Sequence, residues 1–505
     1  MFATRWRISL PPHKLWGMSR RSVLKKACVA PWHGIATNLP VRKTERVTPR
    51  NIAVSTGLDE WLAAIDRRTA RVGIIGLGYV GLPLTLLFSE ELFRVTGFDI
   101  DREKVVSLNE GRSYIHRIET DHIQAAQRSG FHATSDFSEI ANMDAVLICV
   151  PTPLNEDHTP DMSYVVSTIE AIAPHLRAGQ LVVLESTTYP GTTEEIVVET
   201  INRHGSSKGL KVLRNAASPA EANELDGVMV AFSPEREDPG NMITPRRDIP
   251  KVIGGVDTRA TAAASALYGS VFRKTVPMSS PAAAEMTKLL ENIYRCVNIA
   301  LVNELKQICE PMGIDIWEVI EAAATKPFGF QAFYPGPGVG GHCIPVDPFY
   351  LNWKAQQFGV QAKFIELAGE VNEAMPAYVV QSAARALERN GVALRGAKVL
   401  VLGVAYKRDV DDLRESPSLV VIEKLRQAGA NVEYNDPFFP EVGRGRHYHL
   451  HMRSTPLEDL GRFDCVLILT DHSLYNYGEI VNQAKLVVDS RNATRSIESP
   501  KIVRC

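Results

Sequence analysis

One cysteine of this chain stands in a loop that suits a nucleophile. The segment 338–347 reads GVGGHCIPVD, which is too rich in glycine for a core strand or a helix, and it places Cys343 four residues before the carboxylate of Asp347. A thiol on such a loop can approach a substrate closely and bond to it covalently. Cys343 is therefore a candidate nucleophile, although an inert thiol would be the better interpretation if this loop stood alone.

A glycine turn supplies a second group of candidate residues. Residues 76–81 read GLGYVG, follow an apolar run directly and open a helical segment, and Asp99 ends the next apolar run. Glycines there let the backbone approach a pyrophosphate, while a carboxylate binds the adenosine ribose and repels a 2'-phosphate. The pattern predicts an NAD site, and a glycine turn without a nucleotide is disfavoured because strand, glycines, helix and acid occur together. The predicted cofactor residues are Gly76, Gly78, Tyr79, Val80, Gly81 and Asp99.

Alternating apolar and helical segments must position these groups. After a short amphipathic helix at 58–66, apolar runs alternate with stretches of helical period, which predicts a parallel, doubly wound sheet. These runs cover 72–75, 94–98, 145–150, 181–185 and 228–232. The alternation restarts near residue 397, with runs at 399–403, 432–434, 465–469 and 486–489 and a helix at about 417–428. The run 399–403 lacks the second and third glycines of the first turn, so no second dinucleotide is expected.

A helical region separates the two alternating regions. Residues 281–311 contain no internal Gly or Pro and predict one long, mostly buried helix, and a second helical stretch covers about 362–390. The predicted fold class is α/β, with two doubly wound Rossmann-like sheet domains bridged by a helical central domain. A ligand is expected in the cleft between the two sheets.

Composition excludes several classes of protein. With 45% hydrophobic and 23% charged residues the chain has the composition of a globular enzyme, and no apolar run is long enough for a transmembrane helix. Residues 1–50 carry eleven Lys and Arg against one acid, which leaves −12 for residues 51–505 and no basic footprint for nucleic acid. The seven cysteines form no CxxC pair, so neither a disulfide framework nor a metal site is indicated.

The basic N-terminal segment has more than one interpretation. Arg20 and Arg21 resemble a twin-arginine export signal, and the lack of acids also suits a transit peptide. We favour a basic, disordered extension over residues 1–57, with the protein in the cytoplasm.

The motifs together resemble the UDP-glucose/GDP-mannose dehydrogenase family over residues 71–495. The matching segments are GLGYVG at 76–81, CVPTP at 149–153, ESTTYPGTT at 185–193, SPER at 233–236, KLLEN at 288–292, GVGGHCIPVD at 338–347 and YKRDVDDLRES at 406–416. SPEREDPGN at 233–241 and GHCIPVDPFYL at 341–351 look closest to the UDP-N-acetylglucosamine 6-dehydrogenase branch. The resemblance implies an NAD-binding domain at 58–278, a central and dimerisation domain at 279–392 and a UDP-sugar-binding domain at 393–505.

The resemblance also implies a reaction. The C6 alcohol of a UDP-hexose, with UDP-N-acetylglucosamine favoured, would be oxidised by NAD in two hydride transfers through a thiohemiacetal and a thioester on Cys343. Lys288 would stabilise developing oxyanions, and Asn292 follows one helical turn later on the same face. Glu235 would act as general base for thioester hydrolysis, with Asp347 holding water or the base. Thr152 and Thr187 fall at strand ends near the expected nicotinamide, with Thr187 also a candidate catalytic residue.

Cations of the second sheet domain would meet the UDP diphosphate. The catalytic candidates also have simpler interpretations: Lys288 as a solvated helix lysine, Glu235 and Asp347 as members of loop salt bridges, and Thr152 and Thr187 as turn residues. The predicted substrate-binding residues are Lys407, Arg408, Arg414, Glu235, Arg236, Phe333, Tyr334 and Gly340.

Substrate choice and two rival functions remain open at this point. UDP-glucose dehydrogenases commonly have a second glutamate after the SPE-like motif where this chain has Pro239, which favours a 2-acetamido sugar. UDP-glucose, UDP-N-acetylmannosamine and GDP-mannose stay as alternatives. A 3-hydroxyacid dehydrogenase would have no use for the cysteine loop, and a non-catalytic NAD-binding regulator is disfavoured because the whole set of catalytic candidates is present. The expected partners are a UDP-sugar and a second copy of the chain through the central helix, with neither nucleic acid nor membrane.

Overall fold

The structure is a computed structural model of the chain. It describes residues 57–115, 118–155, 157–205, 208–215, 221–236, 244–341, 344–444 and 448–505. The predictions for the basic extension, for Pro239 and for Cys343 itself lie outside these ranges.

The N-terminal sheet has the predicted doubly wound form. The order of its eight described strands is β3-β2-β1-β4-β5-β6-β7-β8, and neighbours are parallel except β6 and β7. The strands are β1 Arg71–Ile75, β2 Arg94–Phe98, β3 His132–Thr134, β4 Ala145–Ile148, β5 Leu181–Leu184, β6 Met229–Phe232, β7 Lys251–Gly255 and β8 Thr275–Met278. The helices are α1 Leu58–Asp66, α2 Gly81–Glu90, α3 Arg102–Asn109, α4 Thr120–Arg128, α5 Ser163–Ile172, α6 Glu199–Gly205 and α7 Thr258–Gly269.

Both faces of this sheet are buried, which explains its continuous apolar runs. In β5, Leu181 and Val183 belong to one buried cluster, whereas Val182 and Leu184 belong to a second cluster on the other face. Successive side chains of a strand point to opposite faces, so a sheet covered on both sides needs an apolar residue at every position. The predicted run 145–150 is longer than β4 because residues 149 and 150 already leave the strand.

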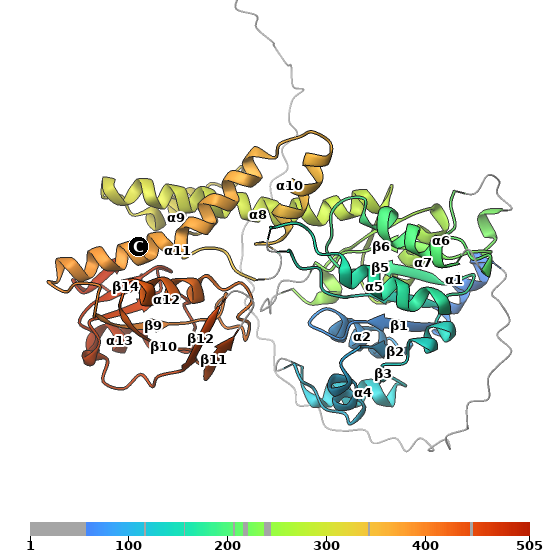
Figure 1. The fold of residues 1–505 in the computed structure, drawn as a ribbon, viewed down its shortest axis with the longest axis horizontal. Coiled ribbons are helices and arrows are strands. Elements are labelled where there is room, and N and C mark those ends of the chain that lie inside the picture. The colour runs from blue at the N-terminus through green and yellow to red at the C-terminus, as the bar shows by residue number, and fades with distance from the viewer. Residues whose placement is uncertain are drawn as a thin grey trace, which may run out of the picture. The chain divides into compact units, whose positions relative to one another are not determined.

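The central region contains the predicted long helix. Helix α8 spans Pro281–Cys309; Ser280 caps it by accepting a hydrogen bond from the Ala283 N–H, and Pro281 occupies its first turn. Helix α9 covers Ile316–Ala324, α10 covers Asp347–Gln357, and α11 covers Lys363–Arg389. Helices α8 and α11 lie side by side (Figure 1), and the Asn303 amide donates to Asn372 Oδ1 across them at 2.9 Å. None of the described helices combines the length and apolar character needed to cross a bilayer.

The expectation that the long helix is mostly buried was wrong. Helix α8 carries a row of large apolar side chains with 36–59% exposure, which we call the α8 row. Its spacing follows the helical period, so the side chains share one side of the helix. The α8 row consists of Met286, Leu290, Tyr294, Leu301, Leu305 and Ile308.

A second parallel sheet forms the C-terminal domain. Its order is β10-β9-β13-β14-β15, and helix α11 covers one face through Val379, Ala383 and Leu387. The strands are β9 Lys398–Leu402, β10 Asn431–Asn435, β13 Cys465–Ile468, β14 Val487–Asp489 and β15 Ile502–Arg504, and a separate hairpin pairs β11 Glu441–Arg444 with β12 His449–Arg453. Helices α12 Pro417–Gln427 and α13 Tyr477–Gln483 complete the domain. The predicted fold class is confirmed.

Candidate active site

The glycine turn lies where the strand order of the first sheet reverses. Strand β1 pairs with β2 on one side and with β4 on the other, and such a switch point is the usual ligand site of a doubly wound sheet. Gly76 has a φ of +88°, and a Cβ added at Gly81 would lie 1.9 Å from the Gly76 carbonyl oxygen. A Cβ at Gly78 would meet nothing within 4 Å. The turn is thus closely packed at Gly76 and Gly81 but open at Gly78, as close approach of a pyrophosphate requires. Its residues fit NAD.

Asp99 faces the same turn. It follows β2 and is buried; its Oδ2 accepts a hydrogen bond from the Leu77 N–H at 2.9 Å and its Oδ1 accepts one from the Asp101 N–H at 2.9 Å. Lys104 Nζ stands 3.9 Å from Oδ2. The carboxylate is therefore held at the turn, where an adenosine ribose would meet it.

This placement predicts a strong preference for NAD over NADP. A 2'-phosphate would be brought against a buried carboxylate, and like charges in a poorly solvated place repel strongly. Initial rates with the two cofactors at equal concentration should differ by about 10²-fold or more, since such a charge clash costs several kcal/mol. Equal rates would contradict the role of Asp99.

The two predicted threonines come together beside the turn. Thr152 follows β4, Thr187 follows the neighbouring strand β5, and the Thr152 hydroxyl donates to the Thr187 carbonyl oxygen at 2.7 Å. The Tyr350 hydroxyl of helix α10 donates to the Thr152 carbonyl oxygen at 2.6 Å. This hydrogen bond connects the end of β4 with helix α10, which begins four residues after Cys343.

Three predicted catalytic residues meet between α8 and α10. Lys288 and Asn292 lie one turn apart on α8, and the Asn292 amide donates to the Asp347 carboxylate at the first residue of α10. All three are at most 5% exposed. Among the described residues, none forms an ion pair or hydrogen bond with the Lys288 ammonium, so this cation is available to a substrate oxygen.

The environment of Asp347 brings its titration close to neutral pH. Burial raises the pKa of this carboxyl to about 6, against the lowering influence of the Lys288 ammonium, the Asn292 amide and the Arg295 guanidinium. A carboxyl with a pKa near the working pH exchanges protons readily. Asp347 can therefore hold or pass a proton beside Lys288.

Glu235 is the opposite case, a buried carboxyl kept ionised. Burial alone would raise its pKa, but the charges of Lys251, Arg246 and Lys288 outweigh that effect and lower the pKa below its ordinary value. Its Oε1 also accepts a hydrogen bond from the Arg236 N–H at 3.0 Å. An ionised carboxylate within the field of Lys288 suits the role of general base.

Lys251, which pairs with both Glu185 and Glu235, was not identified from the sequence. Lys251 opens β7 and lies 2.5 Å from Glu185 Oε2 at the end of β5 and 3.6 Å from Glu235 Oε2. The Tyr268 hydroxyl of α7 also donates to Glu185. The only signal in the sequence was a lysine at the start of the apolar run KVIGG.

Several predicted substrate cations already have carboxylate partners. Arg414 pairs with Asp412 at 2.6 Å and its guanidinium lies 4.8 Å from the Tyr79 ring. Arg408 contacts Asp471 at 3.3 Å, and Arg236 pairs with Glu291 on α8. The structure therefore brings the GLGYVG turn to the loop of Arg414, but a substrate would have to share these cations with their acids. Lys407 lies in the same loop, next to Arg408.

The predicted substrate-binding residues Phe333, Tyr334 and Gly340 have close neighbours in the structure. Tyr334 stacks on Trp317 of α9 at a centroid distance of 5.5 Å, so one face of its ring is covered. Phe333 makes a T-shaped contact with Tyr294 of α8 at 5.6 Å. A Cβ at Gly340 would lie 2.7 Å from Tyr406 Cβ, and the Gly341 N–H donates to the Arg414 carbonyl oxygen at 3.0 Å. The glycines before Cys343 thus allow close contact with the C-terminal domain.

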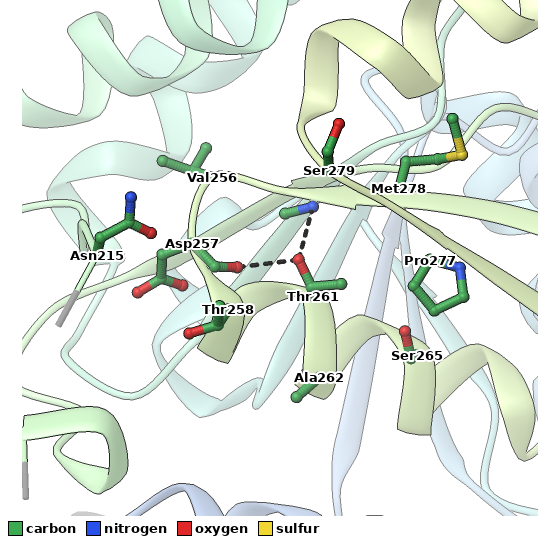
Figure 2. A pocket seen from close by; sticks show the side chains of 11 residues that line it. Asn215, Val256, Asp257, Thr258, Thr261, Ala262, Ser265, Pro277, Met278 and Ser279 are labelled. Atoms are coloured by element: carbon green, nitrogen blue, oxygen red, sulfur yellow. Dashed lines mark hydrogen bonds between the residues drawn. The ribbon is translucent and has the colours of Figure 1, made fainter. Parts of the chain in front are cut away.

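A separate hollow lies at the start of α7 (Figure 2). It is lined by Asp257, Thr258, Thr261 and Met278, among others, and none of the predicted site residues lines it. The Thr261 hydroxyl is engaged locally, because it accepts from the Gly255 N–H and donates to the Asp257 carbonyl oxygen. This hollow therefore does not compete with the cluster around Lys288 as a catalytic site.

Known proteins resemble the chain along most of its length. Residues 70–272 match the NAD binding domain of the UDP-glucose/GDP-mannose dehydrogenase family, residues 282–374 its central domain and residues 400–496 its UDP binding domain. The UDP-N-acetyl-D-mannosamine dehydrogenase of Escherichia coli (strain K12) is 36% identical over 440 residues, 84% of this chain and 99% of that protein. The NDP-N-acetyl-D-galactosaminuronic acid dehydrogenase of Ralstonia nicotianae is 35% identical over 85% of this chain and 97% of its own. The solved structure of UDP-D-ManNAc dehydrogenase from Pyrococcus horikoshii is 31% identical, covers 86% of this chain and 98% of that chain, and has a TM-score of 0.74.

Proposed function

The chain belongs to the UDP-glucose/GDP-mannose dehydrogenase family of NAD-dependent nucleotide-sugar dehydrogenases, and from that premise we propose its specific reaction. The protein oxidises the C6 alcohol of a UDP-linked 2-acetamido-hexose to the carboxylate, with Cys343 as covalent nucleophile. The observation that carries this proposal is the meeting of Lys288, Asn292 and Asp347 at the start of α10, four residues after Cys343.

NAD, bound at the glycine turn, supplies a hydride acceptor for each of the two oxidation steps. In the first step the C6 hydroxyl passes its proton to a water molecule beside the Asp347 carboxyl, while the Lys288 ammonium stabilises the developing negative charge on oxygen. Carbon C6 gives up a hydride in the same step, which leaves an aldehyde. The Cys343 thiolate then adds to the aldehyde carbon, and the resulting thiohemiacetal again carries a C–H bond that can lose a hydride. That second loss leaves a thioester.

Hydrolysis of the thioester ends the reaction. Glu235 accepts a proton from a water molecule as its oxygen bonds to the thioester carbon, and Lys288 stabilises the charge on the carbonyl oxygen. The C–S bond then breaks, which releases the uronate and the Cys343 thiolate. Asn292 fixes the Asp347 carboxyl, whose pKa near 6 lets it hold or return a proton beside these steps.

The acetamido group is the finer part of the proposal. Support comes from Pro239 in place of a second glutamate, and from relatives whose names refer to N-acetylmannosamine and N-acetylgalactosaminuronic acid. The sequence favoured the N-acetylglucosamine epimer, and this remains a prediction. Residues 58–278, 279–392 and 393–505 are proposed as the NAD, central and UDP-sugar units.

Assembly and location are further parts of the same proposal. The α8 row is an exposed apolar surface on the central domain, as a homodimer interface would be before its partner covers it. We place the reaction in the cytoplasm, where NAD and nucleotide sugars are available.

The proposed route predicts about two NADH for each uronate formed, because a thiohemiacetal gives up a second hydride. Purified protein should be incubated with NAD and separate UDP-sugars, with NADH followed by absorbance and the product by mass. The panel contains the gluco, galacto and manno epimers of UDP-N-acetylhexosamine, UDP-glucose and GDP-mannose. An acetamido sugar should have a higher kcat/KM than UDP-glucose; one NADH with accumulating aldehyde would exclude the thioester route.

A further inference from the structure

We propose that Lys251 is a positioning residue that holds Glu235 in place and ionised for thioester hydrolysis. The inference rests on the proposed function and adds a residue to it. Among the described residues, the polar partners of Lys251 are Glu185, Glu235 and the Pro234 carbonyl oxygen, and none of them belongs to the glycine turn or to the cysteine loop. Its influence on the reaction therefore passes through Glu235.

The reversed strand puts the lysine opposite the base. Strands β6 and β7 are antiparallel, with Ala231 opposite Gly255 and Phe232 opposite Gly254. Continued for three residues in each direction from Phe232 and Gly254, the same antiparallel register brings Glu235 opposite Lys251. The Ser233 hydroxyl donates to the Val252 carbonyl oxygen at 2.9 Å, which shows that the chain stays beside β7 after β6 ends.

Two aromatic rings and a second carboxylate fix the ammonium. Lys251 Nζ lies 2.5 Å from Glu185 Oε2 and donates to the Pro234 carbonyl oxygen at 3.1 Å, next to Glu235 itself. It also lies 5.1 Å from the Tyr268 ring centroid and 5.5 Å from that of Phe272. A lysine with so many partners cannot swing toward solvent, and its side chain is only 3% exposed.

The charges around Glu235 give the sign of the effect. Lys251 on β7, Arg246 in the turn before it and Lys288 on α8 favour the ionised carboxylate. The like charge of Glu235 in turn raises the pKa of Glu185, which directly follows β5. Without Lys251, two buried carboxylates would face each other and the pKa of Glu235 would rise. A general base works above its pKa, so the acid limb of the hydrolysis rate should move to higher pH.

The test compares Lys251→Met with Lys251→Arg. Rapid-mixing experiments should follow the second half-reaction, release of the uronate from the enzyme, from the lowest pH at which the protein stays folded, about pH 4, to about pH 9. Lys251→Met should shift the acid limb upward by about one pH unit or more, so that release slows most at the acid end of the range and recovers as the pH rises. Lys251→Arg keeps the charge and should restore most of the rate. The melting temperature of each variant reports whether it folds.

Glu185→Gln separates positioning from mere structure and serves if Lys251→Met does not fold. It removes the competing carboxylate but leaves Lys251 beside Glu235, so the acid limb should not rise and release should be retained. If the pair were only structural, breaking it from either side would slow release equally at every pH, and that result would overturn the inference. Absence of uronate from the wild-type protein would instead refute the proposed function.

A matched control is available on α7. Arg259 is also buried, and its Nε lies 2.7 Å from Oδ2 of Asp257, a residue that lines the hollow of Figure 2. Arg259→Met should lower stability and leave the pH profile of release unchanged. A shift of the acid limb in this control equal to that in Lys251→Met would also overturn the inference.

Discussion

Cys343→Ser should give a folded protein that no longer converts its substrate to the uronate. Serine is nearly isosteric with cysteine, so little packing is lost, but its hydroxyl has a far higher pKa and yields a poorly hydrolysed ester. Net conversion should fall by about 10³-fold or more, the scale expected when a covalent nucleophile is removed. The first hydride transfer needs no thiol and should survive better, so aldehyde should appear in place of the uronate.

Intact-protein mass spectrometry checks this prediction most directly. Wild type, and a Glu235→Gln variant slowed in hydrolysis, should show a sugar-nucleotide adduct on the Cys343 peptide after mixing with substrate and NAD. Cys309→Ser is the matched control, since Cys309 is a free, half-buried thiol at the end of α8. A fully active Cys343→Ser protein would end the covalent mechanism.

Lys288→Ala should damage both hydride transfers, because each develops negative charge on an oxygen that the ammonium would stabilise. Loss of one preorganised donor of this kind slows a reaction by about 10²-fold or more. The control is Lys306→Ala: Lys306 lies on the same helix, is 6% exposed against 5% for Lys288, and donates to the Arg504 carbonyl oxygen far from the cluster. Single-turnover rates of NADH formation distinguish the two variants.

The two largest effects have different signatures. Cys343→Ser should leave the first burst of NADH and remove the second, whereas Lys288→Ala should slow both. Equal loss of NADH formation in Lys288→Ala and Lys306→Ala would mean that the substitution acts through helix stability and not through charge at the substrate.

The elements with strong local patterns were predictable from the sequence. Helices α1 and α8 follow from apolar spacing and, for α8, from the absence of internal Gly and Pro. The turn at Gly76 and the acid at Asp99 were recognisable because their spacing reflects one βαβ unit. The shared helix face of Lys288 and Asn292 follows directly from the helical period.

What the sequence missed depends on contacts between distant segments. Helix α10 begins with Asp347 and Pro348 directly after a glycine-rich loop, and its mixed aromatic and polar residues give little amphipathic signal. The partnership of Lys251 with Glu185 joins residues 66 apart in the chain through a strand reversal that no local pattern announces. The exposed α8 row was misread because apolar residues at helical spacing look alike whether they face a core or an open surface.

Asp99 sets a limit on attempts to redesign the cofactor preference. Its carboxylate has two roles. It lies where the ribose would bind, and it accepts a hydrogen bond from the Leu77 N–H inside the glycine turn. An engineer who replaces it with alanine removes the repulsion toward a 2'-phosphate, but also leaves a buried amide without its acceptor and loosens the loop that must grip the dinucleotide. Asparagine or serine keeps an acceptor near Leu77 without the charge. Converting this enzyme to NADP therefore calls for a neutral acceptor at position 99, not simply for a smaller residue.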